Sequence, residues 1–203
     1  MHLAKRIFED VEAYKANGVD GLIACGSQRS YFPTGLAYYV FARKQYDITL
    51  SFHAILKEYF ETAFGSEWES FADYLRGIAD IFGDKYLEGE ESADKSISLY
   101  YNPARAEKLR AIKAVTEKGM KLIEKCYNSS DRIKTASVRL LEYHAKYCEA
   151  LAEVFALKAD GKKEQAAELM ERLAEEMNKS EIYTERYFDH YFAISFFRRL
   201  IRL

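Results

Sequence analysis

The chain has 203 residues, of which 49% are hydrophobic and 31% charged, a balance typical of a folded globular protein and not of a disordered one. Its 30 basic residues nearly match its 32 acidic residues, so the charge gives no reason to expect a nucleic acid as partner. Three cysteines indicate reduced thiols in a cytoplasmic protein, and no apolar run approaches the roughly 20 residues of a membrane span.

Apolar residues recur at helical spacing along most of the chain. Ser66 with Glu69 predicts a capping box, Asn102 before Pro103 predicts a cap followed by proline in the first turn, and Ser180 is expected to cap the last helix. The pattern is therefore typical of a mainly α protein. Helices are expected over residues 3–16, 35–45, 51–64, 66–82, 102–126, 131–159, 166–177 and 181–201.

One segment departs from the helical pattern. Val19 to Cys25 is short, apolar and strand-like, yet no other segment predicts a strand with which it could pair. The polar, glycine-bearing stretch 86–99 is the best candidate for a linker. It would divide a first unit, residues 1–85, from an antiparallel helical bundle at residues 100–203.

Cysteine and histidine side chains are candidates for catalysis or metal binding. Cys25 and His144 invite comparison with a thiol protease, but the predicted strand end and mid-helix positions are the wrong context for that chemistry. His144 and Cys148 lie one helical turn apart and could offer two metal ligands. A buried histidine with a hydrogen-bond partner is the favoured interpretation, because leucines share that face.

Two features near the C-terminus have similar alternatives. Glu185 and Asp189, beside His190, suggest a carboxylate pair, but an ion pair with Arg186 is the favoured interpretation. The aromatic run from Tyr183 to Phe197 has apolar residues on more than one side, which favours a role in the core and in an interface. No Glu-x-x-His motif of a di-metal site is present, and we expect neither metal nor cofactor.

The stretch "YCEALAEVFALKADGKKEQAAELMERLAEE" is similar to one tetratricopeptide-type hairpin. No second copy follows at the expected period of about 34 residues, so a hairpin of an ordinary bundle is favoured. A helical protein-interaction module remains an alternative function.

The loop after the predicted strand carries residues suited to ligand binding. Tyr31 and Phe32 can stack on sugar faces, and Arg29 offers a fork suited to carboxylates. In α/β architectures, ligand sites collect at the carboxyl ends of strands, which is where this loop would lie.

The first 85 residues carry a family resemblance. The run "GVDGLIACGSQRSYFPTGLAYYVFARKQYD" and the two helices after it resemble the C-terminal part of a family of bacterial glycoside hydrolases. The catalytic region of that family is uncharacterised and similar to α-glucuronidases and β-hexosaminidases. The family usually has Trp-Asn or Trp-Asp where this chain has Tyr46-Asp47. The matching positions are Gly18 to Gly21, Leu36, Tyr39-Val40, Lys44, Tyr59-Phe60, Ala63 to Gly65 and Tyr74-Leu75.

The resemblance implies that the strand is the last of a (β/α)₈ barrel and that the following helices are a helical extension. Glycoside hydrolysis normally needs two carboxylates, and the resemblance maps none onto this chain, so we expect no catalysis by the chain alone. The expected partners are a saccharide, a second copy or a barrel-bearing chain. The residues that would contact the sugar are Gly26, Ser27, Arg29, Tyr31 and Phe32.

Overall fold

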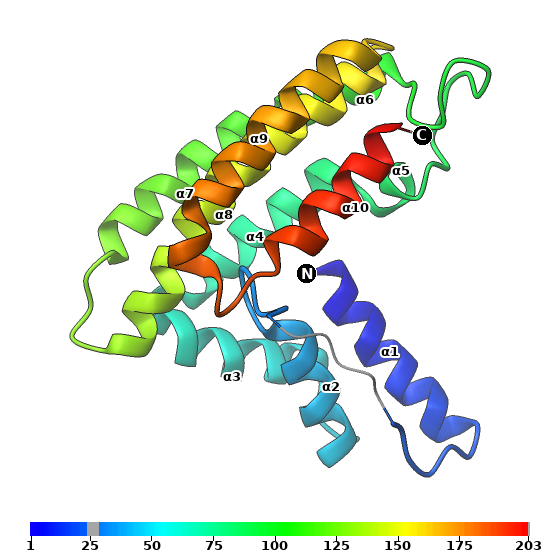
Figure 1. Cartoon of the computed structure of the whole chain (residues 1–203). Coiled ribbons are helices and arrows are strands. Elements are labelled where there is room, and N and C mark those ends of the chain that lie inside the picture. Colours follow the sequence, from blue (N-terminus) through cyan, green and yellow to red (C-terminus); the bar gives the residue numbers. More distant parts are fainter. Residues whose placement is uncertain (24–28, 203) are drawn as a thin grey trace.

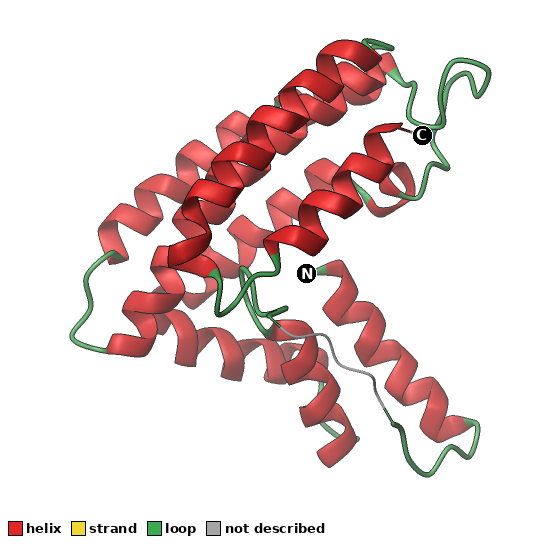
Figure 2. Ribbon diagram, in the orientation of Figure 1, coloured by secondary structure: helices red, strands yellow, loops and turns green. Residues whose placement is uncertain are grey.

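The computed structural model describes residues 1–23 and 29–202, and its regular structure in those ranges is helical (Figure 2), which confirms the predicted mainly α fold. A single 3₁₀ turn, Gly65–Glu67, separates the third and fourth α-helices. The helices are α1 (His2–Ala16), α2 (Leu36–Tyr46), α3 (Phe52–Phe64), α4 (Trp68–Phe82), α5 (Asp84–Leu87), α6 (Pro103–Arg110), α7 (Ile112–Cys126), α8 (Arg132–Ala159), α9 (Lys163–Thr184) and α10 (His190–Arg202).

Cap residues explain where several helices begin. Asn102 accepts a hydrogen bond from the Arg105 backbone N–H at 3.1 Å, and Pro103 occupies the first helical position as predicted. Asp131 caps α8 by accepting from the Ile133 N–H at 2.8 Å. The helix expected over 102–126 is divided at Ala111 into α6 and α7.

Two predicted caps are wrong. Ser66 lies in the 3₁₀ turn, and α4 begins at Trp68 without a side-chain cap. Ser180 lies inside α9, where its hydroxyl donates to the Glu176 carbonyl at 2.6 Å and contacts the Tyr147 hydroxyl. Because that hydroxyl is held within the bundle, α9 continues to Thr184 and the last helix starts only at His190.

The strand predicted over Val19 to Cys25 is absent from its described residues. Residues 19–23 have no regular secondary structure, and the Ile23 side chain is fully exposed. The physical reason is that a strand needs a second strand for its backbone N–H and C=O groups, and residues 1–23 and 29–202 contain no strand that could pair with this segment. Ala24 and Cys25 fall outside the described residues. The barrel remnant that this strand would represent is therefore not observed.

The long helices α8 and α9 lie side by side, and other helices of the bundle pack against them (Figure 1). The short connection at residues 160–162 makes α8 and α9 antiparallel. α6 and α7 pack on α8, and α10 packs on α9. α4 links this bundle to the N-terminal helices, because it contacts both α3 and α7.

The core of the described chain includes residues from both predicted units. Its centre is the buried ring of Phe155 in α8, which meets Phe82, Tyr86 and Tyr100 edge-on or tilted. The Tyr86 hydroxyl donates to the Phe155 and Tyr100 carbonyls. The segment 86–99 is thus anchored at both ends by buried tyrosines, while the proposed division into two domains remains a prediction.

Buried cations hold the ends of helices in this fold. The Arg105 guanidinium donates to the carbonyls of Ile81, at 2.9 Å, and of Phe82 at the end of α4. The Lys158 ammonium donates in the same way to Leu200, at 2.7 Å, and to Ile201 at the end of α10. The last carbonyls of a helix have no partner within the helix, so these side chains satisfy them and fix where each helix ends.

Close packing between α4 and α7 depends on a glycine. A Cβ atom at Gly119 would lie closer than 3.0 Å to three ring carbons of Tyr74. We expect Gly119→Ala to lower the free energy of unfolding by about 1–2 kcal/mol, because overpacking outweighs the gain in helix propensity. Urea denaturation measures this effect, and Gly21→Ala is the control because its Cβ would meet no atom within 4 Å. Equal stability of the two variants would contradict the prediction.

Candidate functional site

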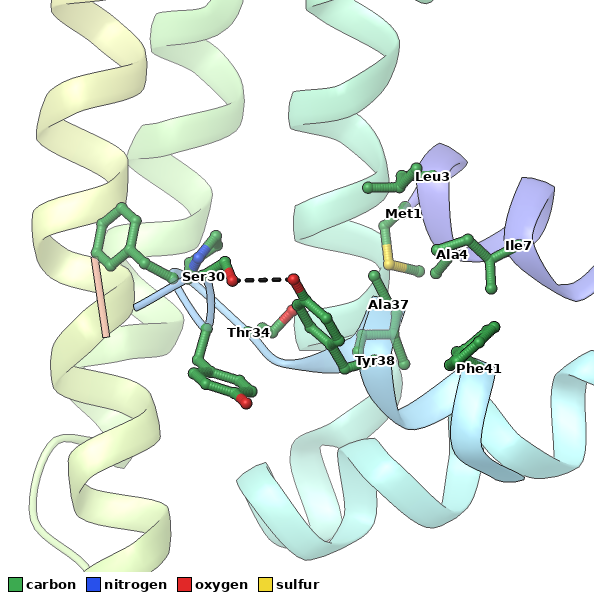
Figure 3. Close-up of a pocket in the computed structure, with 13 residues that line it drawn as sticks. Met1, Leu3, Ala4, Ile7, Ser30, Thr34, Ala37, Tyr38 and Phe41 are labelled. Carbon is green, nitrogen blue, oxygen red and sulfur yellow. Dashed lines mark hydrogen bonds between the residues drawn. The ribbon is translucent and has the colours of Figure 1, made fainter. Parts of the chain in front are cut away.

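A cleft of about 900 Å³ lies between α1, α2 and the loop at residues 30–34 (Figure 3). Hydroxyl groups border one side of it, and the Ser30 and Tyr38 hydroxyls lie 3.0 Å apart. Among the described residues that line the cleft, none has a charged side chain. Its apolar wall is formed by Leu3, Ala4, Ile7, Leu36, Ala37 and Phe41.

The loop that borders the cleft is fixed to the turn between α9 and α10. The Tyr31 backbone N–H donates to the Tyr187 carbonyl at 2.9 Å, and Ser30 forms an isolated antiparallel bridge with Phe188. The Phe32 ring stacks on the Phe188 ring with centroids 4.5 Å apart. The loop therefore has the C-terminal helices as its support.

The Arg29 side chain forms ion pairs with carboxylates of the same chain. Its guanidinium lies 3.4 Å from Asp189 and 4.0 Å from Glu181. The predicted carboxylate-binding group is therefore already paired and is not directed at the cleft. The ion pair expected between Asp189 and Arg186 is formed with Arg29 instead.

Phe32 and Tyr31, also predicted to contact a sugar, point in different directions. The Phe32 ring borders the cleft but packs into the bundle, with ring centroids 5.8 Å from His144 and 5.9 Å from Tyr147. Tyr31 is 48% exposed, and its ring centroid lies 5.5 Å from that of Tyr38. Gly26 and Ser27 lie outside the described residues.

The partly buried His144 and the buried Cys148 form a neutral pair. The His144 Nε2 lies 3.3 Å from the Cys148 Sγ. Burial lowers the His144 pKa to about 4 and raises the Cys148 pKa to about 12. At neutral pH the pair has neither a thiolate nor an imidazolium, so it is not an activated nucleophile. The protease comparison concerns Cys25, which falls outside the described residues.

His190 is held by the same region of the bundle. Its Nε2 lies 2.9 Å from the Thr184 hydroxyl, and its ring packs edge-on against Phe188. Burial lowers the His190 pKa, which favours the neutral ring. Across residues 1–23 and 29–202, no group of three His, Cys, Asp or Glu side chains is arranged to hold a metal ion.

The sequence interpretation missed the α1 and α2 walls of the cleft. A signal is present, since Leu3 and Ile7 in α1, and Ala37 and Phe41 in α2, are pairs separated by four residues. Such spacing indicates that two residues share a helix face, but it does not tell whether that face meets the core or an open cleft.

None of the helices in the described ranges combines the length and hydropathy that crossing a bilayer requires. Comparison of the chain with protein-family models, with curated proteins and with solved structures gave no match.

Proposed function

We propose that this chain is a non-catalytic helical region of a carbohydrate-active glycoside hydrolase and that its cleft holds a neutral saccharide against Tyr31 and Tyr38. The observation that carries the proposal is the pair of accessible tyrosine rings, 5.5 Å apart, beside a cluster of hydroxyls in an open cleft. The choice of a saccharide as the ligand class comes from the resemblance of residues 1–85 to a family of glycoside hydrolases.

The chemistry of the cleft supports a neutral sugar over a uronic acid. Tyrosine rings present an apolar face to the C–H side of a sugar, while hydroxyls can both donate and accept hydrogen bonds with its O–H groups. A uronate would need a cation, and Arg29, the cation of this loop, is paired with Asp189 and Glu181. The other cationic group at the cleft is the α-ammonium of Met1, and burial lowers its pKa, which disfavours its charged form.

The absence of carboxylates from the lining supports a non-catalytic role. Hydrolysis of a glycosidic bond normally requires two carboxyl groups on either side of that bond. The described residues that line the cleft include no aspartate or glutamate. In this proposal the catalytic groups belong to a barrel-bearing chain with which this chain associates.

The exposed segment at residues 19–23 supports such an association. Val19 and Leu22 are more than one-third exposed, Ile23 is fully exposed, and all three belong to a stretch without regular structure. Apolar side chains in such a stretch gain free energy when a partner removes them from water.

The alternative, a tetratricopeptide-like interaction module, has less support. A repeat of that type fits both of its helices into about 34 residues. The α8–α9 hairpin has helices of 28 and 22 residues, which is the geometry of a long bundle hairpin.

Calorimetric titration with neutral oligosaccharides and with uronic acids tests the proposal. We expect Tyr31→Ala and Tyr38→Ala each to weaken neutral saccharide binding about tenfold, which corresponds to loss of about 1.4 kcal/mol of stacking and contact energy. Arg29→Ala is expected to lower the melting temperature through the lost ion pairs and to leave the affinity unchanged.

The matched control is Tyr46→Ala, which removes an exposed tyrosine of α2 that does not line the cleft. The proposal fails if affinity survives both cleft substitutions. It also fails if only uronic acids bind and Arg29→Ala abolishes that binding.

A further inference from the structure

A second pocket, of about 590 Å³, adjoins the cleft. It is lined by residues of the loop before α2, of α2 itself, of α3, of α8 and of the turn between α9 and α10. Its volume falls within the roughly 300–1,000 Å³ that pockets for small molecules usually have. Among the described residues that line it, Arg186 is the one with a charged side chain.

The Arg186 side chain has no carboxylate partner in the described chain. The sequence predicted an ion pair between Arg186 and Asp189, but Asp189 lies 3.4 Å from Arg29 instead. Arg186 is exposed, and within residues 1–23 and 29–202 its guanidinium forms neither an ion pair nor a hydrogen bond. Its planar fork is therefore free to bind a carboxylate from outside the chain.

The turn that carries Arg186 is fixed by backbone hydrogen bonds. The Tyr187 N–H donates to the Thr184 carbonyl at 2.9 Å, and the Tyr187 carbonyl accepts from the Tyr31 N–H at 2.9 Å. The backbone at the mouth of the pocket is thus already ordered, so a ligand would not have to order it on binding.

Two pairs of tyrosine rings line the same pocket. The ring centroids of Tyr31 and Tyr38 lie 5.5 Å apart, and those of Tyr39 and Tyr59 lie 5.3 Å apart. The Tyr59 hydroxyl accepts a hydrogen bond from the Gly35 backbone N–H at 2.7 Å, which holds this ring in place. Aromatic rings favour a further ring as neighbour, stacked with an offset or edge to face.

From this arrangement we infer that the pocket binds a small aromatic carboxylate, with its ring among the tyrosines and its carboxylate on Arg186. A carboxylate has one negative charge, which one guanidinium balances, and its two oxygens match the guanidinium fork. An inorganic phosphate has no ring with which to cover the apolar part of the lining. That part is formed by Pro33, Ala42, Ala63, Phe64 and Leu140.

This inference goes beyond the proposed saccharide site and does not rest on it. Tyr31 and Tyr38 border both spaces, whereas Arg186 lines the pocket and not the cleft. Substitution of Arg186 is therefore expected to change carboxylate binding and to leave the affinity for a neutral saccharide unchanged.

Calorimetric titration with benzoate tests the carboxylate contact, and benzamide is the uncharged probe of the same shape. The wild type is expected to bind benzoate about tenfold more tightly than benzamide, because only benzoate forms a charge-assisted pair with Arg186. Arg186→Gln is expected to lower the benzoate affinity to that of benzamide. The matched control is Arg6→Gln, which removes an exposed arginine that lines neither the pocket nor the cleft.

A blocking substitution tests the place of binding. Ala42 is an exposed residue of α2 in the lining, so Ala42→Trp is expected to fill the pocket and abolish benzoate binding without disturbing the core. Ala54→Trp, at an exposed position of α3 outside the lining, is expected to bind benzoate as the wild type does.

Five results would each overturn the inference. They are a wild type that does not bind benzoate, equal affinity for benzoate and benzamide, tighter binding of inorganic phosphate than of benzoate, an Arg186→Gln variant with unchanged benzoate affinity, and equal affinity of the two tryptophan variants.

Discussion

Replacing Phe155 by alanine is expected to lower the free energy of unfolding by about 3–5 kcal/mol, the range for deleting a buried aromatic ring. The ring has no exposed surface and meets Phe82, Tyr86 and Tyr100, which come from three different segments. These neighbours are fixed by their own contacts, among them the Tyr86 hydrogen bond to the Phe155 carbonyl at 3.2 Å. The cavity left by the substitution can therefore close only in part.

Urea denaturation followed by circular dichroism measures the loss. Tyr46→Ala, which deletes a ring that is 85% exposed, is the control and should change the free energy by less than about 0.5 kcal/mol. A change below about 1 kcal/mol for Phe155→Ala would mean that the four aromatic side chains do not form the centre of the core. If the variant does not fold, Phe155→Leu gives a smaller loss in the same direction.

The stability of the protein is expected to rise between pH 8 and pH 10.5 through Lys158. Burial lowers the Lys158 pKa to about 8, whereas the unfolded chain has the ordinary value of 10.5. Between these values the folded state has released a proton that the unfolded state still binds, so unfolding becomes less favourable as the pH rises. By pH 9.5 this contribution is expected to reach about 2 kcal/mol relative to pH 7.

Several tyrosines oppose this trend at higher pH, because burial raises the pKa of Tyr59 and Tyr74. The Lys158 contribution is therefore measured as the difference in unfolding free energy between the wild type and Lys158→Met at each pH. Lys158→Gln, which keeps a neutral donor near the Leu200 carbonyl, serves as a second reference. Parallel pH profiles for all three proteins would show that Lys158 does not change its charge on folding.

Most helices could be predicted from the sequence because their apolar spacing and caps are local. The boundary between the last two helices could not, since both Ser180 and Asp189 have the chemistry of an N-cap. The choice depends on distant groups: Tyr147 holds the Ser180 hydroxyl, while Asp189 accepts from the Phe192 N–H at 2.9 Å and caps α10. Tertiary contacts therefore decide between two equally good local signals.

For the candidate site, the sequence could indicate which loop takes part but not how the side chains of that loop are directed. The sequence indicated the loop around Tyr31, and that loop does border the cleft. The directions of its side chains were not predictable, because Arg29 and Phe32 turn towards residues near the other end of the chain, at Asp189 and Phe188. The prediction of a strand was wrong for a related reason, because a local apolar pattern does not reveal whether a second strand is present to pair with it.

The loop around Phe32 also has a consequence for biosynthesis. Arg29 and Asp189 are separated by 160 residues, and the aromatic partner of Phe32 emerges from the ribosome just as late. At about 5–20 residues per second, Phe188 is synthesised on the order of ten to thirty seconds after Phe32. During translation the Phe32 ring therefore has no Phe188 ring to stack on until the last helices have been made.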